Sequence, residues 1–106
     1  MNQIMSEVVW TDIAYREFWD IPRAILARCG SCWFFFNSRF DDDIDEYIDH
    51  YEVWRLPLIS EDQRNGSWLL FPGIALEKMP NIELNSLPFK MKLRGRGTVE
   101  APNTHL

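Results

Sequence analysis

Apolar and polar positions along the first third of the chain alternate in short runs that predict β-strands. Residues 13–19 are rich in β-forming side chains, and the run ends before Pro22, because proline removes a ladder donor and restricts the residue before it. Residues 23–29 and 32–37 flank a Gly30-Ser31 pair. Two β-rich runs separated by two turn-forming residues predict a β-hairpin.

The period of the pattern changes after residue 40. Apolar residues then recur at i, i+3, i+4 and i+7, the spacing of one helix face, at Ile44, Tyr47, Ile48 and Tyr51. The three acids at 41–43 would cap free N–H groups at the helix start and meet the positive end of its dipole. The pattern therefore predicts a short acidic helix over this stretch, which needs tertiary packing to be stable.

The remaining segments are shorter. Residues 51–56 read as a strand that ends at a proline, residues 60–67 as a polar loop, and residues 74–79 as a helical turn. Short strands are expected at 82–84 and at 89–93, where alternating lysines would protect an open sheet edge. Residues 1–9 are expected to be a loose arm or a first edge strand.

Together, the predicted segments amount to about five or six short strands and one short acidic helix. We expect a mainly β or α+β fold, with a small curled antiparallel sheet or an open barrel. A chain of 106 residues is sized for a single domain. We assign residues 1–94 to that domain and 95–106, which have little to bury, to a flexible tail.

Charge limits the choice of partner. The net charge is −5, and residues 1–60 carry eleven acids against five bases. Nucleic acid is therefore not expected as the main ligand, because phosphate binding depends on a basic face. The chain shows no export-signal pattern at its start and no apolar run approaching the about 20 residues that cross a bilayer. We expect a cytoplasmic protein without membrane contact, whose two cysteines are reduced.

Those cysteines form a C-x-x-C motif, Cys29 to Cys32. In a redox site the first cysteine begins a helix, but Trp33 and the phenylalanines after it favour a strand. A zinc site needs further ligands, and neither His50 nor His105 stands in a paired ligand spacing. Two thiols flanking a hairpin turn are the simplest interpretation, and redox or metal chemistry is the alternative.

Carboxylates at alternate positions suggest a second metal site. Asp41, Asp43, Asp45 and Glu52 fall on ligand positions of the calcium loop of an EF-hand, which residues 41–52 resemble. However, Glu46 occupies the position where the sharp turn requires glycine. The flanking segments also read as strands rather than helices. An acid-capped amphipathic helix explains the same residues, so cation binding is kept only as an alternative.

No nucleophile elbow, zinc-protease motif, phosphate loop or dinucleotide motif is present. We therefore expect a non-enzymatic protein without a cofactor, and a small enzyme whose site matches none of these motifs is kept as an alternative. Acids and aromatics gather instead on one predicted face, where aromatic anchors inside a charged rim suit protein binding. The candidate partner-binding residues are Asp42, Asp45, Asp49, Tyr47 and Trp54. The partner would be a basic protein, with an immunity or antitoxin role against a cationic toxin as a specific case. A homodimer through an edge strand is a further possibility.

Overall fold

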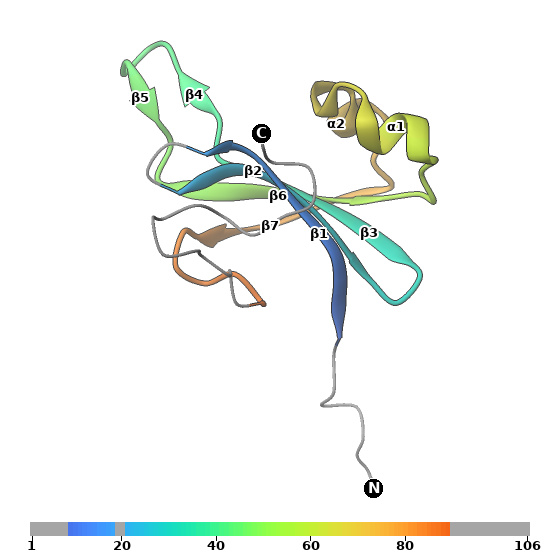
Figure 1. The fold of residues 1–106 in the computed structure, drawn as a ribbon. Coiled ribbons are helices and arrows are strands. Elements are labelled where there is room, and N and C mark those ends of the chain that lie inside the picture. The colour runs from blue at the N-terminus through green and yellow to red at the C-terminus, as the bar shows by residue number, and fades with distance from the viewer. Residues whose placement is uncertain (1–8, 19–20, 90–106) are drawn as a thin grey trace, which may run out of the picture.

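A computed structural model describes residues 9–18 and 21–89, which form a mostly β fold (Figure 1). The main sheet has five antiparallel strands in the order β1-β2-β3-β6-β7. Their bounds are β1 Trp10–Phe18, β2 Pro22–Cys29, β3 Cys32–Asn37, β6 His50–Leu56 and β7 Glu77–Glu83. The sheet is open rather than a closed barrel, because its two outer strands do not pair with each other. The predicted fold class is confirmed.

The central hairpin of β2 and β3 forms as the sequence predicts. Six residue pairs run in register from Ala24 opposite Asn37 to Cys29 opposite Cys32. Gly30 opens the two-residue turn with a φ of 64°, a conformation that a residue without Cβ adopts at no steric cost. Both neighbours of this hairpin in the sheet, β1 and β6, are strands that the sequence also indicates.

The acidic helix predicted over 41–50 is wrong. The chain there forms a small hairpin of β4 (Phe40–Asp41) and β5 (Glu46–Tyr47), and then enters β6. The apolar residues do not share a face, since Ile44 is 55% exposed whereas Tyr51 is fully buried. The one acidic helix of the described chain lies elsewhere, at α1.

The connection from β6 to β7 is helical. It contains α1 (Glu61–Asn65), the 3₁₀ turn η2 (Trp68–Leu70) and α2 (Phe71–Ile74). The loop predicted over 60–67 thus holds a helix, because Ser60 and Gln63 form a reciprocal capping box. The helical turn predicted over 74–79 is also wrong: α2 ends at Ile74, and β7 extends the strand expected at 82–84 back to Glu77.

The sheet buries apolar side chains on both faces. On one face, Leu26, Phe35 and Leu56 of the sheet pack with Trp68 and Phe71 of the helical connection, among others. The opposite face contains Tyr15, Ile25, Phe36, Tyr51 and Val53, with partly buried residues from 84–89 against it. The helical connection and the β4–β5 hairpin rise from the same face of the sheet, at its two ends (Figure 1).

Both outer strands are irregular. The register of β1 shifts between Thr11 and Ala14, and β7 contains Pro80 and faces a register shift in β6. Such features discourage pairing between sheet edges, and a homodimer through an edge strand stays a prediction. All but the last residue of the arm predicted at 1–9, most of the strand predicted at 89–93 and the tail predicted at 95–106 lie outside the described residues. Within 9–18 and 21–89, no helix is long and apolar enough to span a bilayer.

Candidate functional site

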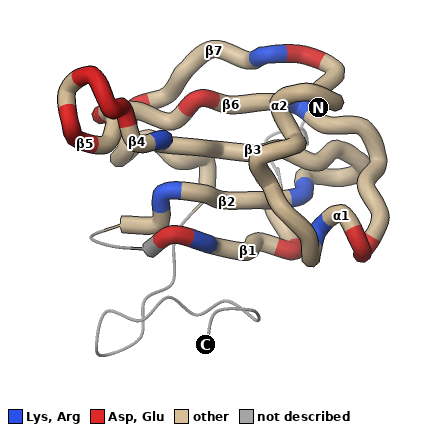
Figure 2. Tube along the Cα trace, turned by 90° about the horizontal axis from the view of Figure 1, so that it is seen from above, with Lys and Arg blue, Asp and Glu red and all other residues tan. Residues whose placement is uncertain are grey.

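The acidic hairpin β4–β5 is organised by its first aspartate. The Asp41 carboxylate accepts a hydrogen bond from the backbone N–H of Asp43 at 2.9 Å. The backbone carbonyl of Asp41 accepts another from the backbone N–H of Ile44 at 3.3 Å. Asp45 has a φ of 56°, a left-handed conformation that aspartate tolerates better than most residues. Residues 42, 43, 45 and 46 are all exposed acids, and acidic positions of the chain gather at the end of the β4–β5 hairpin (Figure 2).

A buried serine joins this hairpin to the sheet. Ser38 is fully buried, and its hydroxyl accepts a hydrogen bond from Arg23 Nη1 at 2.9 Å and donates one to the carbonyl of Ile48 at 2.8 Å. The Arg23 guanidinium also lies 4.6 Å from the centre of the Tyr47 ring, a cation–π contact. These contacts link both sides of the hairpin to β2, so its position on the sheet is held by specific bonds.

Two apolar side chains lie among the acids of the hairpin. Phe40 is 45% exposed and Ile44, in the turn, is 55% exposed. The Phe40 ring meets the ring of Tyr47 edge-on, with centroids 5.3 Å apart. An exposed aliphatic and an exposed aromatic side chain inside a rim of carboxylates form a surface of mixed character. We call residues 40–49 the acidic surface.

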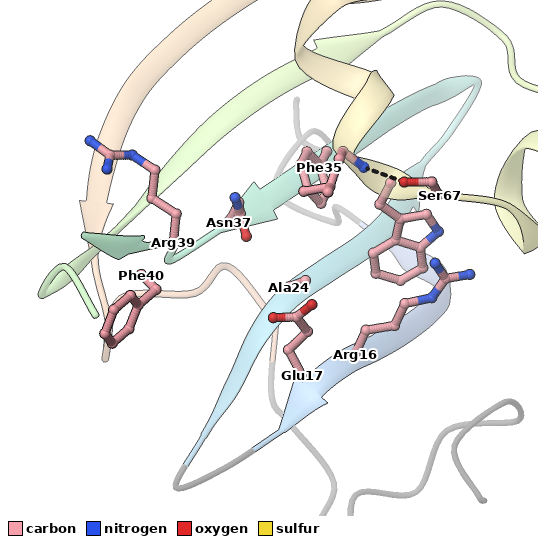
Figure 3. A pocket seen from close by; sticks show the side chains of 10 residues that line it. Arg16, Glu17, Ala24, Phe35, Asn37, Arg39, Phe40 and Ser67 are labelled. Atoms are coloured by element: carbon pink, nitrogen blue, oxygen red, sulfur yellow. Dashed lines mark hydrogen bonds between the residues drawn. The ribbon is translucent and has the colours of Figure 1, made fainter. Parts of the chain in front are cut away.

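A hollow of about 360 Å³ separates the acidic surface from the helical connection (Figure 3). Ala24, Phe35 and Asn37 from β2 and β3 line it together with Phe40 and Leu69, which is 78% exposed. The remaining lining residues are Arg16, Glu17, Arg39, Ser67 and Trp68. Its size is that of a pocket for a small ligand or for one or two side chains of a partner.

The charged groups of the hollow differ in their availability. Arg16 donates to the carbonyls of Gly66 at 2.6 Å and Arg64 at 3.0 Å, and its guanidinium stacks 4.0 Å from the Trp68 ring. Burial lowers the pKa of this guanidinium, and the nearby Glu17 carboxylate opposes the shift. Arg16 thus joins the edge strand to the helical connection and serves the fold.

Other polar groups of the hollow have fewer contacts. Within the described chain, neither the Asn37 amide nor the Glu17 carboxylate forms a side-chain hydrogen bond or ion pair, whereas Arg39 pairs with Glu52 at 3.3 Å. The hollow therefore offers a carboxylate, an amide and a displaceable ion pair beside an apolar floor. This set suits a polar or basic side chain better than an anion, since the Arg16 guanidinium is already engaged.

The structure brings together four of the five residues that the sequence proposes for partner binding. Asp42 and Asp45 lie in the turn, Tyr47 lies on β5, and Asp49 follows it with its side chain almost fully exposed. Trp54 does not join them. It lies on β6, stacks on Phe35 with ring centroids 5.8 Å apart and packs, partly buried, against the core under the helical connection.

The residues proposed for metal binding do not converge. The Asp41 carboxylate accepts a hydrogen bond within the turn, and Glu52, on β6, pairs with Arg39. Among the described residues, no group of three or more histidine, cysteine or carboxylate side chains is arranged to hold a metal ion. Cys29 and Cys32 are free, half-buried thiols on either side of the β2–β3 turn, as the hairpin interpretation expects.

Sequence reasoning missed the apolar side of the hollow. The helical connection leaves Leu58, Leu69, Leu70, Ile74 and Leu76 exposed, and of these Leu69 lines the hollow. The signal for Leu69 and Leu70 in the sequence is the apolar run from Trp68 to Phe71, of which only the first and last side chains are buried. A four-residue run in which two members face solvent is typical of a short helical segment packed by one side only.

Comparisons with known proteins do not identify a family for this chain. No protein-family model, no curated protein and no solved structure matches it. The functional argument therefore depends on the acidic surface and on the hollow beside it.

Proposed function

We propose that this protein is a non-enzymatic interaction module of the cytoplasm that binds a basic protein through its acidic surface. The observation that carries the proposal is an uncompensated cluster of charge around exposed apolar side chains. Residues 41–49 hold six carboxylates and no lysine or arginine. Within the described chain, none of the six forms an ion pair with a basic residue other than His50.

An uncompensated cluster of this kind attracts cationic partners over distances of about 8 Å at physiological salt. Such attraction raises the association rate more than the final affinity. Phe40 and Ile44 supply exposed apolar area within the same surface, and apolar anchors contribute most to affinity when a partner buries them. The hollow beside Phe40 would accept one or two side chains of the partner next to Glu17 and Asn37.

An immunity or antitoxin role is the specific case in which the basic partner is a cationic toxin. What supports it is the charge of the surface alone. A toxin that binds nucleic acid presents a basic face, and an acidic protein that covers such a face would block it.

The proposal is tested by reversing charge on the hairpin. Proteins captured from the cytoplasm by the full chain are identified, the partner is purified, and its association rate is measured at low and physiological salt. Asp42→Lys combined with Asp45→Lys should slow association by about tenfold or more and reduce its salt dependence, because the steering charge is lost. Both side chains are exposed and lack ion pairs with described residues. Lysine at position 45 must take the left-handed conformation of Asp45 at a small cost, so circular dichroism checks that the fold is retained.

A matched control separates the location of the charge from its amount. Asp62→Lys with Glu83→Lys makes the same change in net charge at exposed positions on α1 and β7. We expect this control to slow association by less than about threefold, because distant exposed charges are screened. Equal slowing by the two variants, or unchanged binding by the hairpin variant, would contradict the proposal.

A further inference from the structure

The two cysteines of the chain are direct partners across the central hairpin. Cys29 ends β2, Cys32 begins β3, and the two residues pair in the antiparallel register. Side chains of directly opposite residues point to the same face of a sheet. The chain contains no other cysteine, so this pair is the one intrachain dithiol that the protein can form.

The spacing of an antiparallel pair suits a disulfide bond. Opposite residues have Cα atoms about 4.5–5.5 Å apart, and disulfides accept Cα separations of about 4.4–6.8 Å. The turn between the cysteines is firmly held, because Gly30 takes its left-handed conformation without strain and its carbonyl accepts a hydrogen bond from Arg28 Nε at 2.9 Å. Closure of the bond therefore needs side-chain rotation rather than a new backbone arrangement.

The thiols are also placed for reaction with a small molecule. Both cysteines are half-buried, so a small disulfide can reach them at the end of the hairpin. A redox pair of the thioredoxin type requires a helix after its first cysteine, whereas here a strand follows. The site thus differs from a helical C-x-x-C in that its partner thiol is positioned by strand pairing.

We propose that Cys29 and Cys32 form a cross-strand dithiol that reacts with low-molecular-weight disulfides and closes reversibly to an intrachain disulfide. The thiolate of one cysteine attacks a sulfur of the small disulfide, which forms a mixed disulfide and releases one small thiol. The thiolate of the other cysteine then attacks the mixed disulfide and releases the second small thiol. Two electrons pass from the protein dithiol to the small disulfide, and the two thiol protons leave with the products. This inference is independent of the proposed partner binding.

The test uses the full chain, reduced, freed of reductant and treated with oxidised glutathione. We expect both thiols to be lost to a thiol reagent, the mass to fall by two hydrogen atoms, and the protein to stay monomeric, with full reversal by dithiothreitol. The closed form should also melt at a higher temperature than the reduced form, because the bond constrains the unfolded chain. Stable glutathione adducts, disulfide-linked dimers or unreacted thiols as the end product would each overturn the inference.

Two variants test whether the pairing of Cys29 with Cys32 across the hairpin is what allows the disulfide to close. Cys32→Ser removes the second thiol, so the glutathione adduct on Cys29 should accumulate. Ser31→Cys combined with Cys32→Ser keeps two thiols but moves one of them into the turn, out of register with Cys29. This variant should retain glutathione adducts as well, and closure at the rate of the parent would show that strand pairing plays no part.

Discussion

The buried hydroxyl of Ser38 provides the most direct test of how the acidic hairpin is held. Ser38→Ala removes the acceptor of Arg23 Nη1 and the donor to the Ile48 carbonyl. A hydrogen bond to a charged group contributes about 1.5–3 kcal/mol and a neutral one about 0.5–1.5 kcal/mol. Because Ser38 has no solvent exposure, water cannot replace the lost partner without a rearrangement. We therefore expect Ser38→Ala to lower the free energy of unfolding by about 2–4 kcal/mol.

The measurement is urea unfolding followed by tryptophan fluorescence. For a slope of about 2 kcal/mol per molar, the midpoint should fall by about 1–2 M while the slope itself is unchanged. Native-state hydrogen exchange should also quicken at the Ile48 amide, which bonds to the Arg39 carbonyl at 3.0 Å beside the lost hydroxyl. A hairpin held by this serine loosens before the sheet does.

Two controls separate hydrogen bonding from packing. Ser38→Cys nearly keeps the shape of the side chain but replaces the hydroxyl by a weak donor and acceptor, and it should lose most of the same stability. Ser31→Ala changes an exposed serine in the β2–β3 turn and should stay within about 0.5 kcal/mol of the parent. If Ser38→Ala is as stable as the parent, the hydroxyl does not hold the hairpin and the reasoning fails.

Two further predictions concern β1. Arg16→Ala removes the bonds to the Gly66 and Arg64 carbonyls and the contact with Trp68, so urea unfolding should show a loss of about 1–3 kcal/mol. Arg16→Lys should recover less than half of it because lysine lacks the planar fork, and full recovery would contradict this role. Burial raises the pKa of Tyr15 in the folded protein above the unfolded value of about 10. The free energy of unfolding should therefore fall as pH rises above about 10, because the unfolded chain loses the Tyr15 proton first. Tyr15→Phe should flatten this alkaline loss in pH-dependent melts, and identical profiles would refute it.

The central hairpin could be predicted because its signals are local. Gly30 is the one residue of its turn that needs a left-handed conformation, and the β-rich runs on either side have no competing helical pattern. The acidic hairpin could not be predicted in the same way. The spacing of Ile44, Tyr47, Ile48 and Tyr51 fits a helix, and only packing shows that the first is exposed and the last fully buried.

Packing overrides the helical spacing for an identifiable reason. Tyr51 donates a hydrogen bond to the Pro22 carbonyl at 2.7 Å and is buried on the sheet face opposite the helical connection. It makes these contacts because it lies in a strand beside β3. The Asp41 carboxylate accepts a hydrogen bond from the Asp43 N–H, a contact that suits an Asx turn as well as a helix start. This local bond therefore does not decide between the two conformations. A short acidic helix gains little by itself, so the tertiary contacts of its C-terminal end decide the conformation.

The candidate site likewise has one part that the sequence predicts and one part that it does not. The charge of the acidic surface, and the membership of Asp42, Asp45, Tyr47 and Asp49 in it, follow from their closeness in the chain. The hollow does not follow, because its lining comes from β1, from β2 and β3 and from Ser67 to Leu69. Trp54 is the opposite case, since it is near the acids in sequence but packs against the core under the helical connection.

By itself, the sequence determined the β-rich class, the central hairpin with its paired cysteines, and the acidic character of residues 41–49. Each of these depends on neighbouring residues, whose local preferences act before any distant contact forms. Only the tertiary structure decided that the acidic stretch is a hairpin standing opposite a helical connection across one face of the sheet (Figure 1). That arrangement depends on contacts between distant segments, such as Arg16 with Gly66 and Arg23 with Ser38, which no local pattern encodes.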